Sequence, residues 1–279
     1  MRNRCSKEKL SQHIRQHKST FVVYIVLRIL VIASLVLAVI RSDYESAFVC
    51  LLVLILFMAP WFIQSNFGIC FPSTLEIIIL LFIFATEMLG EIQCYYVTFK
   101  YWDTIMHTIN GFICAAVGFS LIEILNRDPL LKFNVSPFFV ALVAFCFSMT
   151  IGVLWEFFEF AMDRIFFWDM QKDTVLHSIS SVALDPTNSN LPIVIKDITS
   201  ASINGQELGL GGYLDIGLYD TMEDLFVNFV GAFLFSVLGY LNLKRRDGSK
   251  FVENFVPTLT TNENKETQAH EDPSPPSVG

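Results

Sequence analysis

The sequence predicts an all-α, polytopic integral membrane protein that folds as a six-helix transmembrane bundle, and three observations carry this prediction. First, 53% of the 279 residues are hydrophobic and 16% are charged, whereas soluble domains carry about 25% charged residues. Second, the apolar residues come in long blocks, and a block of about 20 such residues matches the hydrocarbon thickness of a bilayer. Third, basic residues gather at both ends of the chain.

Six apolar blocks are candidates for membrane-spanning helices, of which the second and third are the shortest. They are Phe21–Ile40, Ala47–Ile63, Thr74–Gly90, Thr104–Leu125, Phe138–Met162 and Met222–Leu243. The first block follows a basic segment but is too long for the apolar region of a cleavable signal peptide. We therefore expect it to remain as an anchor, and we predict a membrane domain over residues 20–244.

Basic residues flank the bundle on both sides in the sequence. Those before the first block and after the last are Arg2, Arg4, Lys7, Lys9, Arg15, Lys18, Lys244, Arg245, Arg246 and Lys250. The positive-inside rule places both groups in the cytoplasm, which requires an even number of crossings and predicts an N-in/C-in topology. We expect residues 1–19 to form a basic cytoplasmic segment. Residues 245–279 are rich in Thr, Asn, Glu, Ser and Pro and are expected to form a disordered cytoplasmic tail.

The segment 169–219, between the fifth and sixth blocks, is predicted to be a long extracytoplasmic loop. It contains a β-branched run at Leu191–Ile195 and a glycine-rich end at Gly209–Gly217. Because a structureless connection of this length is unusual, we expect it to fold over the outer face of the bundle and to include a short hairpin.

The composition also limits the roles expected for the cysteines and the kinds of binding partner. The six cysteines are scattered singly without a C-x-x-C pair, as is typical of small buried side chains rather than disulfide or zinc partners. There is no basic patch with interleaved aromatic residues, so nucleic acid is not an expected partner. The lipid bilayer is the partner that the sequence predicts.

Ionisable and polar residues gather where four of the blocks meet the predicted outer face. The spacings within each set are three or four residues, which places the set on one face of its helix. Ionised carboxylates that face lipid cost about 3 kcal/mol or more, so we expect these groups to face the bundle interior or a water-filled cavity. The sets are Glu87 and Glu91; Asp103 and His107; Glu156, Glu159 and Asp163; and Asp220, Asp224 and Asn228.

A cluster of so many carboxylates requires either bound protons or a cation. Carboxylate oxygens with one imidazole suit Mg²⁺, Mn²⁺, Zn²⁺ or Fe²⁺. The predicted ligands of one divalent metal ion are Asp103, His107, Glu156, Asp220 and Asp224. Glu156 or Glu159 is the candidate general base, and Glu87, Glu91, Asp163 and Asn228 form the supporting polar cluster. The alternative is a hydrogen-bonded network that orients the helices without catalysis, because the spacing matches no named metal motif.

These residues also carry a resemblance to a known family. The chain resembles the YjdF-type family of bacterial inner-membrane proteins and is more distantly similar to VanZ-like proteins, over about Glu87 to Leu243. The matching series is Trp102-Asp103-x-x-x-His107-x-x-x-Gly111, Glu156-x-x-Glu159 and Gly217-x-x-Asp220-Thr-x-x-Asp224-x-x-x-Asn228-x-x-Gly231-Ala.

The resemblance implies a bacterial plasma membrane and a shared polar site. VanZ-like proteins are associated with low-level resistance to glycopeptides of the teicoplanin type. Glu159 stands where VanZ-like proteins often have Gln, which weakens transfer of its role. The resemblance supplies no reaction, because the YjdF-type family is uncharacterised.

Three functions remain open from the sequence. The first is a metal-assisted enzyme that acts on an envelope lipid or a lipid-linked substrate. The second is a proton- or cation-coupled transporter, which would more often show repeated halves and broken helices. The third is a non-catalytic membrane scaffold with a structural polar cluster. The sequence fixes neither the substrate nor the reaction, the metal or the oligomeric state.

Overall fold

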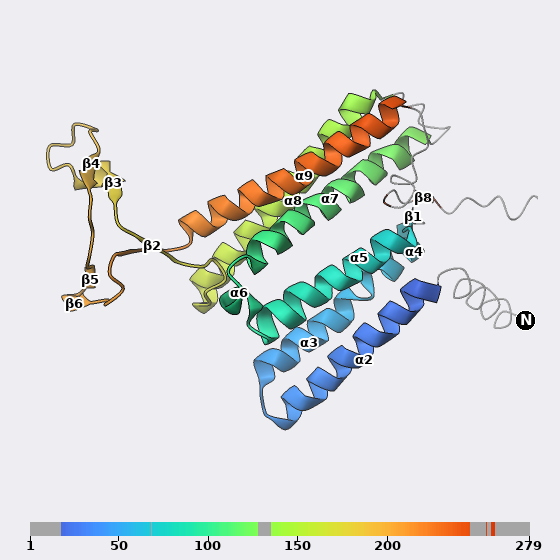
Figure 1. The fold of residues 1–279 in the computed structure, drawn as a ribbon, viewed down its shortest axis with the longest axis horizontal. Coiled ribbons are helices and arrows are strands. Elements are labelled where there is room, and N and C mark those ends of the chain that lie inside the picture. The colour runs from blue at the N-terminus through green and yellow to red at the C-terminus, as the bar shows by residue number, and fades with distance from the viewer. Residues whose placement is uncertain (1–17, 68, 128–134, 246–254, 256–257, 260–279) are drawn as a thin grey trace, which may run out of the picture.

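The computed structural model describes residues 18–67, 69–127, 135–245, 255 and 258–259 (Figure 1). Residues 1–17 of the expected basic segment and most of the expected tail lie outside this described part. The described chain is mostly helical. Its helical segments are α2 (Lys18–Ile40), α3 (Tyr44–Leu56), α4 (Ala59–Phe67), α5 (Ser73–Ile83), the π-helix η1 (Phe84–Ile92), α6 (Tyr95–Thr98), α7 (Trp102–Arg127), α8 (Pro137–Phe166) and α9 (Leu218–Arg245).

Five helical segments of the described chain are long and apolar enough to cross a membrane. They are Ser19–Ile40, Tyr44–Ile63, Trp102–Ile122, Pro137–Phe166 and Leu218–Lys244. They coincide with five of the six blocks that the sequence predicts as spans. Local chemistry sets some of their starts: Asp43 Oδ1 accepts a hydrogen bond from Ser46 N at 3.1 Å before α3, and Ser136 Oγ accepts one from Phe139 N at 3.3 Å before α8. Both are N-cap contacts.

The remaining block, Thr74–Gly90, is helical but is not a single α-helix. The chain passes directly from α5 into η1 at Phe84, so the hydrogen-bond pattern changes partway along the segment. Thr86 Oγ1 lies 3.1 Å from the carbonyl oxygens of both Phe82 and Ile83 and donates to them at this transition. Such side-chain competition for helix carbonyls commonly accompanies an irregularity. The structure therefore shows five candidate spans and leaves the sixth as a prediction.

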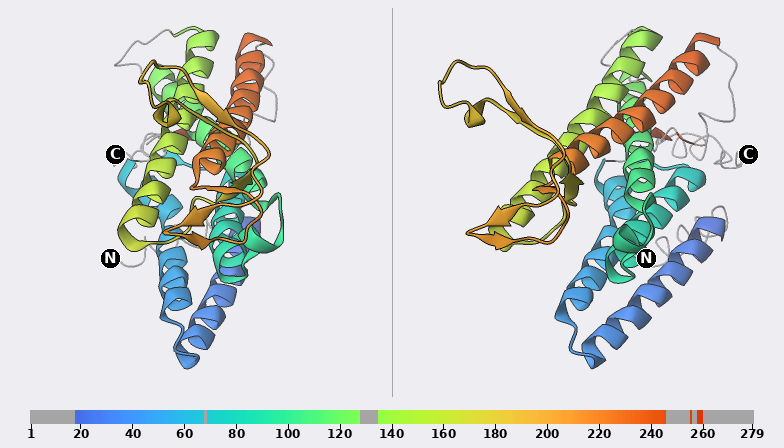
Figure 2. Two further views of the ribbon diagram at one scale, coloured as in Figure 1. Left: turned by 90° about the vertical axis from the view of Figure 1, so that its left-hand side faces the viewer. Right: turned by 60° about the vertical axis from the view of Figure 1, so that its left-hand side comes forward.

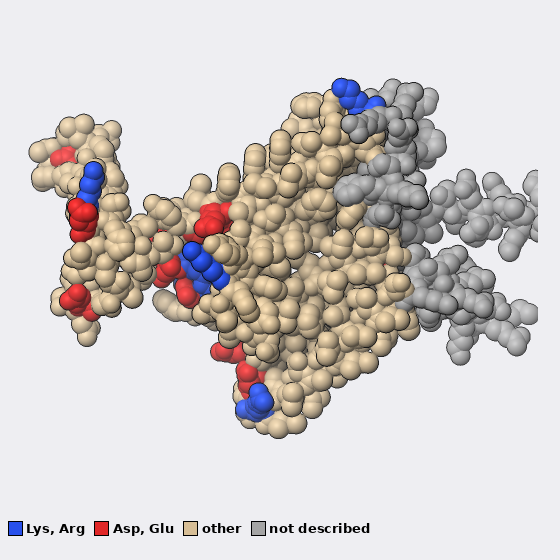
Figure 3. Space-filling view, in the orientation of Figure 1, with Lys and Arg blue, Asp and Glu red and all other residues tan. Residues whose placement is uncertain are grey.

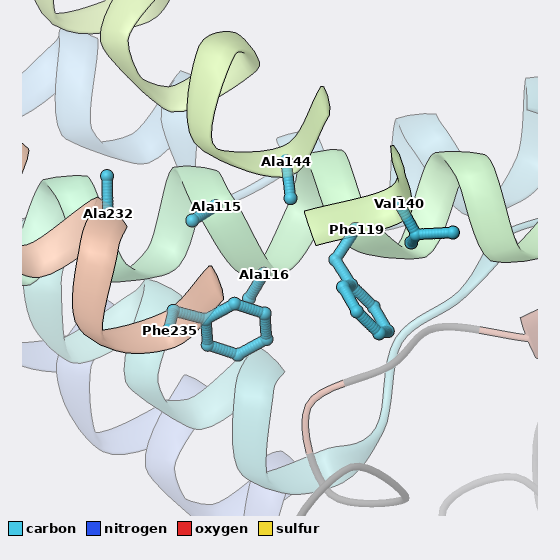
Figure 4. Packing of buried hydrophobic residues seen from close by; sticks show 7 residues of the cluster. All are labelled: Ala115, Ala116, Phe119, Val140, Ala144, Ala232 and Phe235. Carbon is cyan, nitrogen blue, oxygen red and sulfur yellow. The ribbon is translucent and has the colours of Figure 1, made fainter. Parts of the chain in front are cut away.

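The helices form two groups (Figures 1 and 2). The first group is α2, α3, α5 and η1, around a core that includes Val31, Cys50, Val53 and Leu80. The second group is α7, α8 and α9, around the core drawn in Figure 4, which consists of Ala115, Ala116, Phe119, Val140, Ala144, Ala232 and Phe235. The amino end of α2 and the carboxyl end of α9 lie at the same end of the molecule (Figure 1).

Glycines bring the backbones of α7 and α9 into contact, and a serine of α8 bonds to the backbone of α7. A Cβ atom on Gly231 would lie 2.0 Å from the carbonyl oxygen of Thr108, and one on Gly111 would lie 2.2 Å from that of Asn228. Ser148 Oγ donates a hydrogen bond to Gly111 O across 2.8 Å. Small residues allow this approach where lipid supplies no hydrophobic force between helices. The second group is consequently tied together by backbone contact as well as by its core.

The surface of the helices is apolar over a broad area. Figure 3 shows charged side chains gathered at the ends of the helices and on the projecting segment, with few between them. Many large apolar side chains on this surface are exposed, such as Ile29, Phe157 and Phe226. An apolar exterior with charged ends is the pattern of a chain surrounded by lipid. The structure therefore agrees with a multi-pass membrane protein.

The connection between α8 and α9 contains short antiparallel strand pairs. The pairs are β2 (Thr174–Leu176) with β7 (Tyr213–Asp215), β3 (Ile179–Ser181) with β4 (Ile193–Ile195), and β5 (Ser202–Ile203) with β6 (Gln206–Glu207). The 3₁₀-helix η2 (Val182–Leu184) follows β3. We call residues 179–207 the arm. The strand pairs agree with the short hairpin expected from the sequence. The arm, however, projects away from the helix ends, whereas the sequence predicted that the loop would cover them (Figures 1 and 2).

One further strand pair joins distant parts of the chain. β1 (Ile69–Cys70) pairs with β8 (Thr258–Leu259) in antiparallel register. The pairing places the connection between α4 and α5 on the same side of the molecule as residues 258–259, which lie beyond α9.

The glycine contact between α7 and α9 gives a first testable prediction. Replacing Gly231 by Ala forces the two backbones apart, because the added Cβ would lie 2.0 Å from the carbonyl oxygen of Thr108. Overpacking of this kind costs about 1–3 kcal/mol, so the apparent melting temperature of detergent-purified Gly231→Ala should fall by several degrees. Ala33→Val on the exposed surface of α2 is the control and should melt like the parent. An unchanged melting temperature for Gly231→Ala would contradict the described helix contact.

Candidate functional site

The candidate site lies where the beginning of α7, the second half of α8 and the beginning of α9 meet. His107, 9% exposed, is at its centre. Its Nε2 lies 3.4 Å from Asp103 Oδ1 and 3.8 Å from Asp224 Oδ2, and its Nδ1 lies 3.9 Å from Glu156 Oε1. All three helices therefore contribute a carboxylate to the surroundings of one imidazole.

Glu159 joins the same cluster from the next turn of α8. Glu156, Glu159 and Asp224 each offer an oxygen within 4.8 Å of the other two, as do the ligand atoms of Asp103, His107 and Asp224. Trp155 Nε1 donates a hydrogen bond to Glu159 Oε1 at 2.8 Å. Glu156 Oε2 and Glu159 Oε2 are buried without a hydrogen-bond partner among the described residues. We call Asp103, His107, Glu156, Glu159 and Asp224 the acidic cluster.

The charges of the acidic cluster are not balanced by the protein. The cluster contains four carboxylates and one imidazole, and within the described chain no Lys or Arg forms an ion pair with these carboxylates. The amino ends of α7 and α9 give partial compensation, because Asp103 and Asp220 lie in the first turns of these helices and helix amino ends favour negative charge. Buried carboxylates of this number still require protons or a cation.

The geometry fits a divalent cation. Ligand atoms about 2.1 Å from one ion stand about 3.0–3.4 Å apart at octahedral or tetrahedral angles. The observed 3.4 Å between His107 Nε2 and Asp103 Oδ1 is at this limit, and 3.8 Å to Asp224 requires only a small inward movement. These separations exceed those of good hydrogen bonds, which are about 2.7–3.2 Å for nitrogen donors. Imidazole nitrogen with carboxylate oxygens is a donor set that Mn²⁺, Fe²⁺ and Zn²⁺ accept.

Asp220 and Asp163, which the sequence assigns to the cluster, accept hydrogen bonds from the backbone that leads into the loop, at residues 170–172. Asp220 Oδ2 accepts a hydrogen bond from Lys172 N at 2.8 Å, and it belongs to neither group of close ligand atoms. Asp163 accepts hydrogen bonds from Met170 N and Gln171 N at 2.7 and 2.9 Å. Both carboxylates therefore hold the base of the loop against α8 and α9, and metal binding by Asp220 stays a prediction.

Glu87, Glu91 and Asn228 lie around the cluster rather than within the two ligand groups. Glu87 and Glu91 are carried by η1, where Glu87 is half-buried and Glu91 is exposed. Asn228 is 1% exposed, and its Nδ2 lies 3.6 Å from the sulfur of Met149. Its Oδ1 is buried and without a hydrogen-bond partner in the described part of the chain. Their supporting role remains a prediction.

The structure adds polar residues that sequence reasoning missed. Gln171 Nε2 donates to Thr221 Oγ1 at 2.5 Å beside Asp220, and Trp155 orients Glu159. Tyr96 on α6 lies close to four carboxylates: burial raises the pKa of its hydroxyl, and Asp103, Glu91, Glu87 and Glu159 raise it further. Its ring packs on Gly90, where a Cβ would lie 2.2 Å from Tyr96 Cε2. Of these contacts, only the one between Trp155 and Glu159 could have been expected from the sequence, because residues four positions apart lie on the same face of a helix.

Residues 22–245 match the family described as "Predicted membrane protein (DUF2238)". The chain belongs to the DUF2238 family. This family of predicted membrane proteins has no established function, and the assignment is consistent with the YjdF-type resemblance. No curated protein and no solved structure was found to match the chain. The DUF2238 match includes four of the candidate spans completely, all but the first three residues of the span Ser19–Ile40, and the whole acidic cluster.

The hydrogen bonds of Asp163 give a second prediction for this DUF2238 protein. Asp163→Ala removes two charge-assisted contacts to the backbone of residues 170 and 171, each worth about 1.5–3 kcal/mol. Trypsin should then cut after Lys172 several times faster than in the parent, as measured by mass spectrometry of the fragments. Asp169→Ala, which removes an exposed carboxylate from the same segment, should leave the rate unchanged. Equal rates in all three proteins would show that Asp163 does not hold the loop base.

Proposed function

We propose that this protein is a metal-dependent membrane enzyme that binds a divalent cation in the acidic cluster and acts on an envelope lipid or a lipid-linked substrate. The observation that carries the proposal is the environment of His107. Its two ring nitrogens face carboxylates from three different helices at 3.4–3.9 Å, and two further carboxylate oxygens in the same place are buried without partners. A structural network would be expected to satisfy these oxygens.

The residues divide into ligands and a base. Asp103, His107 and Asp224 hold the ion, with Glu156 oriented toward His107 Nδ1 as carboxylates commonly are behind metal-bound histidines. Glu159 or Glu156 takes a proton from the attacking hydroxyl or water. The ion, when bound, supplies Lewis acidity toward a phosphoryl or carbonyl oxygen.

The surroundings of the cluster support a lipid substrate. In this proposal the cluster, which lies at one end of the apolar bundle, is near the depth where lipid headgroups meet the hydrocarbon. An open, mostly apolar hollow lies at the start of α7, the helix that carries Asp103, and is lined by Tyr95, Thr98, Phe99, Lys100, Tyr101, Trp102 and Ile105. The exposed side chains along α8 near Glu156, such as Phe157 and Phe160, face outward. A substrate with an acyl chain could therefore approach from the bilayer.

A transporter is less compatible with the packing. The fully buried core residues Ala115, Ala116, Phe119 and Phe235 follow the polar residues along α7 and α9 toward the opposite end of the bundle. An ion crossing this region would leave the carboxylates for mostly apolar surroundings, in which Ser120 and Ser236 offer only neutral hydroxyl groups, at a cost of about 3 kcal/mol or more. Figure 4 shows the core side chains packed together between the helices.

The proposal includes six crossings and an N-in/C-in topology in a bacterial plasma membrane. The continuous helical segment Ser73–Ile92 is then the third crossing, formed by α5 and η1 together. Lys18 and Arg245 at the ends of α2 and α9 support a cytoplasmic location for that end of the bundle. The acidic cluster and the arm would consequently face the outside.

Metal content tests the proposed function directly. We expect the detergent-purified parent to carry a divalent metal after exposure to Mn²⁺ or Zn²⁺, and we expect Asp103→Ala/Asp224→Ala to lose it, as measured by elemental analysis. The parent should also gain thermal stability from the ion, about 2.7 kcal/mol at a free concentration 100 times the dissociation constant. The double variant should gain none.

The matched control is Glu207→Ala/Glu223→Ala, which removes the same number of carboxylates from exposed positions. Glu223 precedes Asp224 in α9 but is exposed, whereas Asp224 is 3% exposed. This control should bind metal like the parent. Absence of metal from the parent under both conditions would rule out a metal-dependent enzyme.

Reporter fusions test the number of crossings. If Ser73–Ile92 spans the membrane, alkaline phosphatase fused after Gly209 should be active in cells and the same reporter fused after Arg245 should be inactive. With only five crossings and the amino terminus inside, both results would be reversed. A fusion after Ser42, between α2 and α3, should be active in either case and serves as the control.

A further inference from the structure

The acidic cluster contains two overlapping sets of ligands that share one residue. Asp103, His107 and Asp224 form the first set, and Glu156, Glu159 and Asp224 form the second. Within each set the ligand atoms lie within 4.8 Å of one another. Asp224 is 3% exposed and is the member that the two sets have in common. A carboxylate has two oxygens and can therefore bind an ion with each of them.

Each of the two carboxylate oxygens of Glu156 is available to a different one of the two ligand sets. Its Oε1 faces His107 Nδ1 at 3.9 Å, on the side of the first set. Its Oε2 is buried and has no hydrogen-bond partner in the described chain, and the residue is 4% exposed. The first set leaves this second oxygen unused.

Glu159 shows the same division. Its Oε1 accepts the hydrogen bond from Trp155 Nε1 at 2.8 Å, while Oε2 is buried without a partner among the residues described. The residue is 7% exposed, so water cannot readily satisfy this oxygen. Unsatisfied, buried carboxylate oxygens are costly for the fold. Glu156 and Glu159 each offer an oxygen within 4.8 Å of the other's, and a cation bound between these two residues would reduce that cost.

The balance of charge agrees with two ions. The two sets together contain four carboxylates, Asp103, Glu156, Glu159 and Asp224, and one imidazole. One divalent ion would leave a net charge of about −2 in a buried space, whereas two would neutralise the carboxylates with His107 uncharged.

We infer that the acidic cluster is a dinuclear metal centre in which Asp224 bridges two divalent cations. One cation is held by Asp103 and His107 and the other by Glu156 and Glu159, which then serve as metal ligands in place of the general-base role proposed above. This inference rests on the proposed function, since it concerns the same site. Two-metal sites place their ions about 3.5–4 Å apart and can bind both oxygens of a displacement reaction.

Manganese provides the test, because two Mn²⁺ ions bridged by a carboxylate are magnetically coupled. The full-length, detergent-purified protein is stripped with a chelator, loaded with Mn²⁺ and desalted, and its metal content is measured together with its electron paramagnetic resonance spectrum. The expected result is two Mn²⁺ per chain with a coupled spectrum. Glu159→Gln and Asp103→Asn, which preserve the shape of each side chain, should each retain about one ion with an uncoupled spectrum. The control Glu223→Gln should behave like the parent.

Each other outcome has a distinct meaning. One Mn²⁺ per parent chain, or two without magnetic coupling, would overturn the dinuclear centre and leave the proposed metal-dependent function standing. No Mn²⁺ in the parent would overturn both. Two coupled ions in Glu159→Gln would show that the second set is not the second site. Melting curves of metal-free parent and variants, recorded in chelator, separate a loss of binding from a loss of fold.

Discussion

The constraint on which the rest of this structure depends is the burial of carboxylates inside a bundle whose exterior is apolar. Glu156, Glu159 and Asp224 are all less than 10% exposed, and lipid cannot solvate them. They must therefore face one another, and α7, α8 and α9 must be close enough for this to occur. The backbone contacts of Gly111 and Gly231 provide that approach. His107 is the basic side chain that these helices bring to the carboxylates, and within the described chain no Lys or Arg pairs with them, so protons or metal ions must supply the rest of the positive charge.

The contrast between the two helix groups follows from this constraint. α2, α3 and α5 pack through apolar side chains such as Val31, Val53 and Leu80, whose attraction is not directional. The group of α7, α8 and α9 has a fixed geometry, because Ser148 bonds to the backbone of Gly111 and His107 must reach carboxylates on each helix. Sites that bind ions need ligands on rigid elements. The second group has this rigidity, and the DUF2238 family match extends across both groups.

Much of the architecture and of the cluster could be predicted from the sequence, because both depend on simple periodicities. Long apolar blocks predict spans, and steps of three and four residues predict that Asp103 and His107, or Glu156 and Glu159, share a helix face. The π-helix at Phe84–Ile92 could not be predicted, since the apolar pattern of Thr74–Gly90 is the same for a regular helix. The roles of Asp163 and Asp220 were also beyond reach. Their partners are backbone N–H groups of residues 170–172, and no sequence pattern distinguishes a carboxylate that binds backbone from one that binds metal.

The apolar core beneath the cluster has a consequence for the conditions under which the site is loaded. Phe119 and Phe235 are completely buried between the cluster and the far end of α7, so an ion bound as proposed would reach the cluster from the end of the bundle at which α7 and α9 begin. The occupancy of the proposed metal site would then follow the pH and the free metal concentration of the solution at that end. The composition of the solution at the opposite end would have little influence on it.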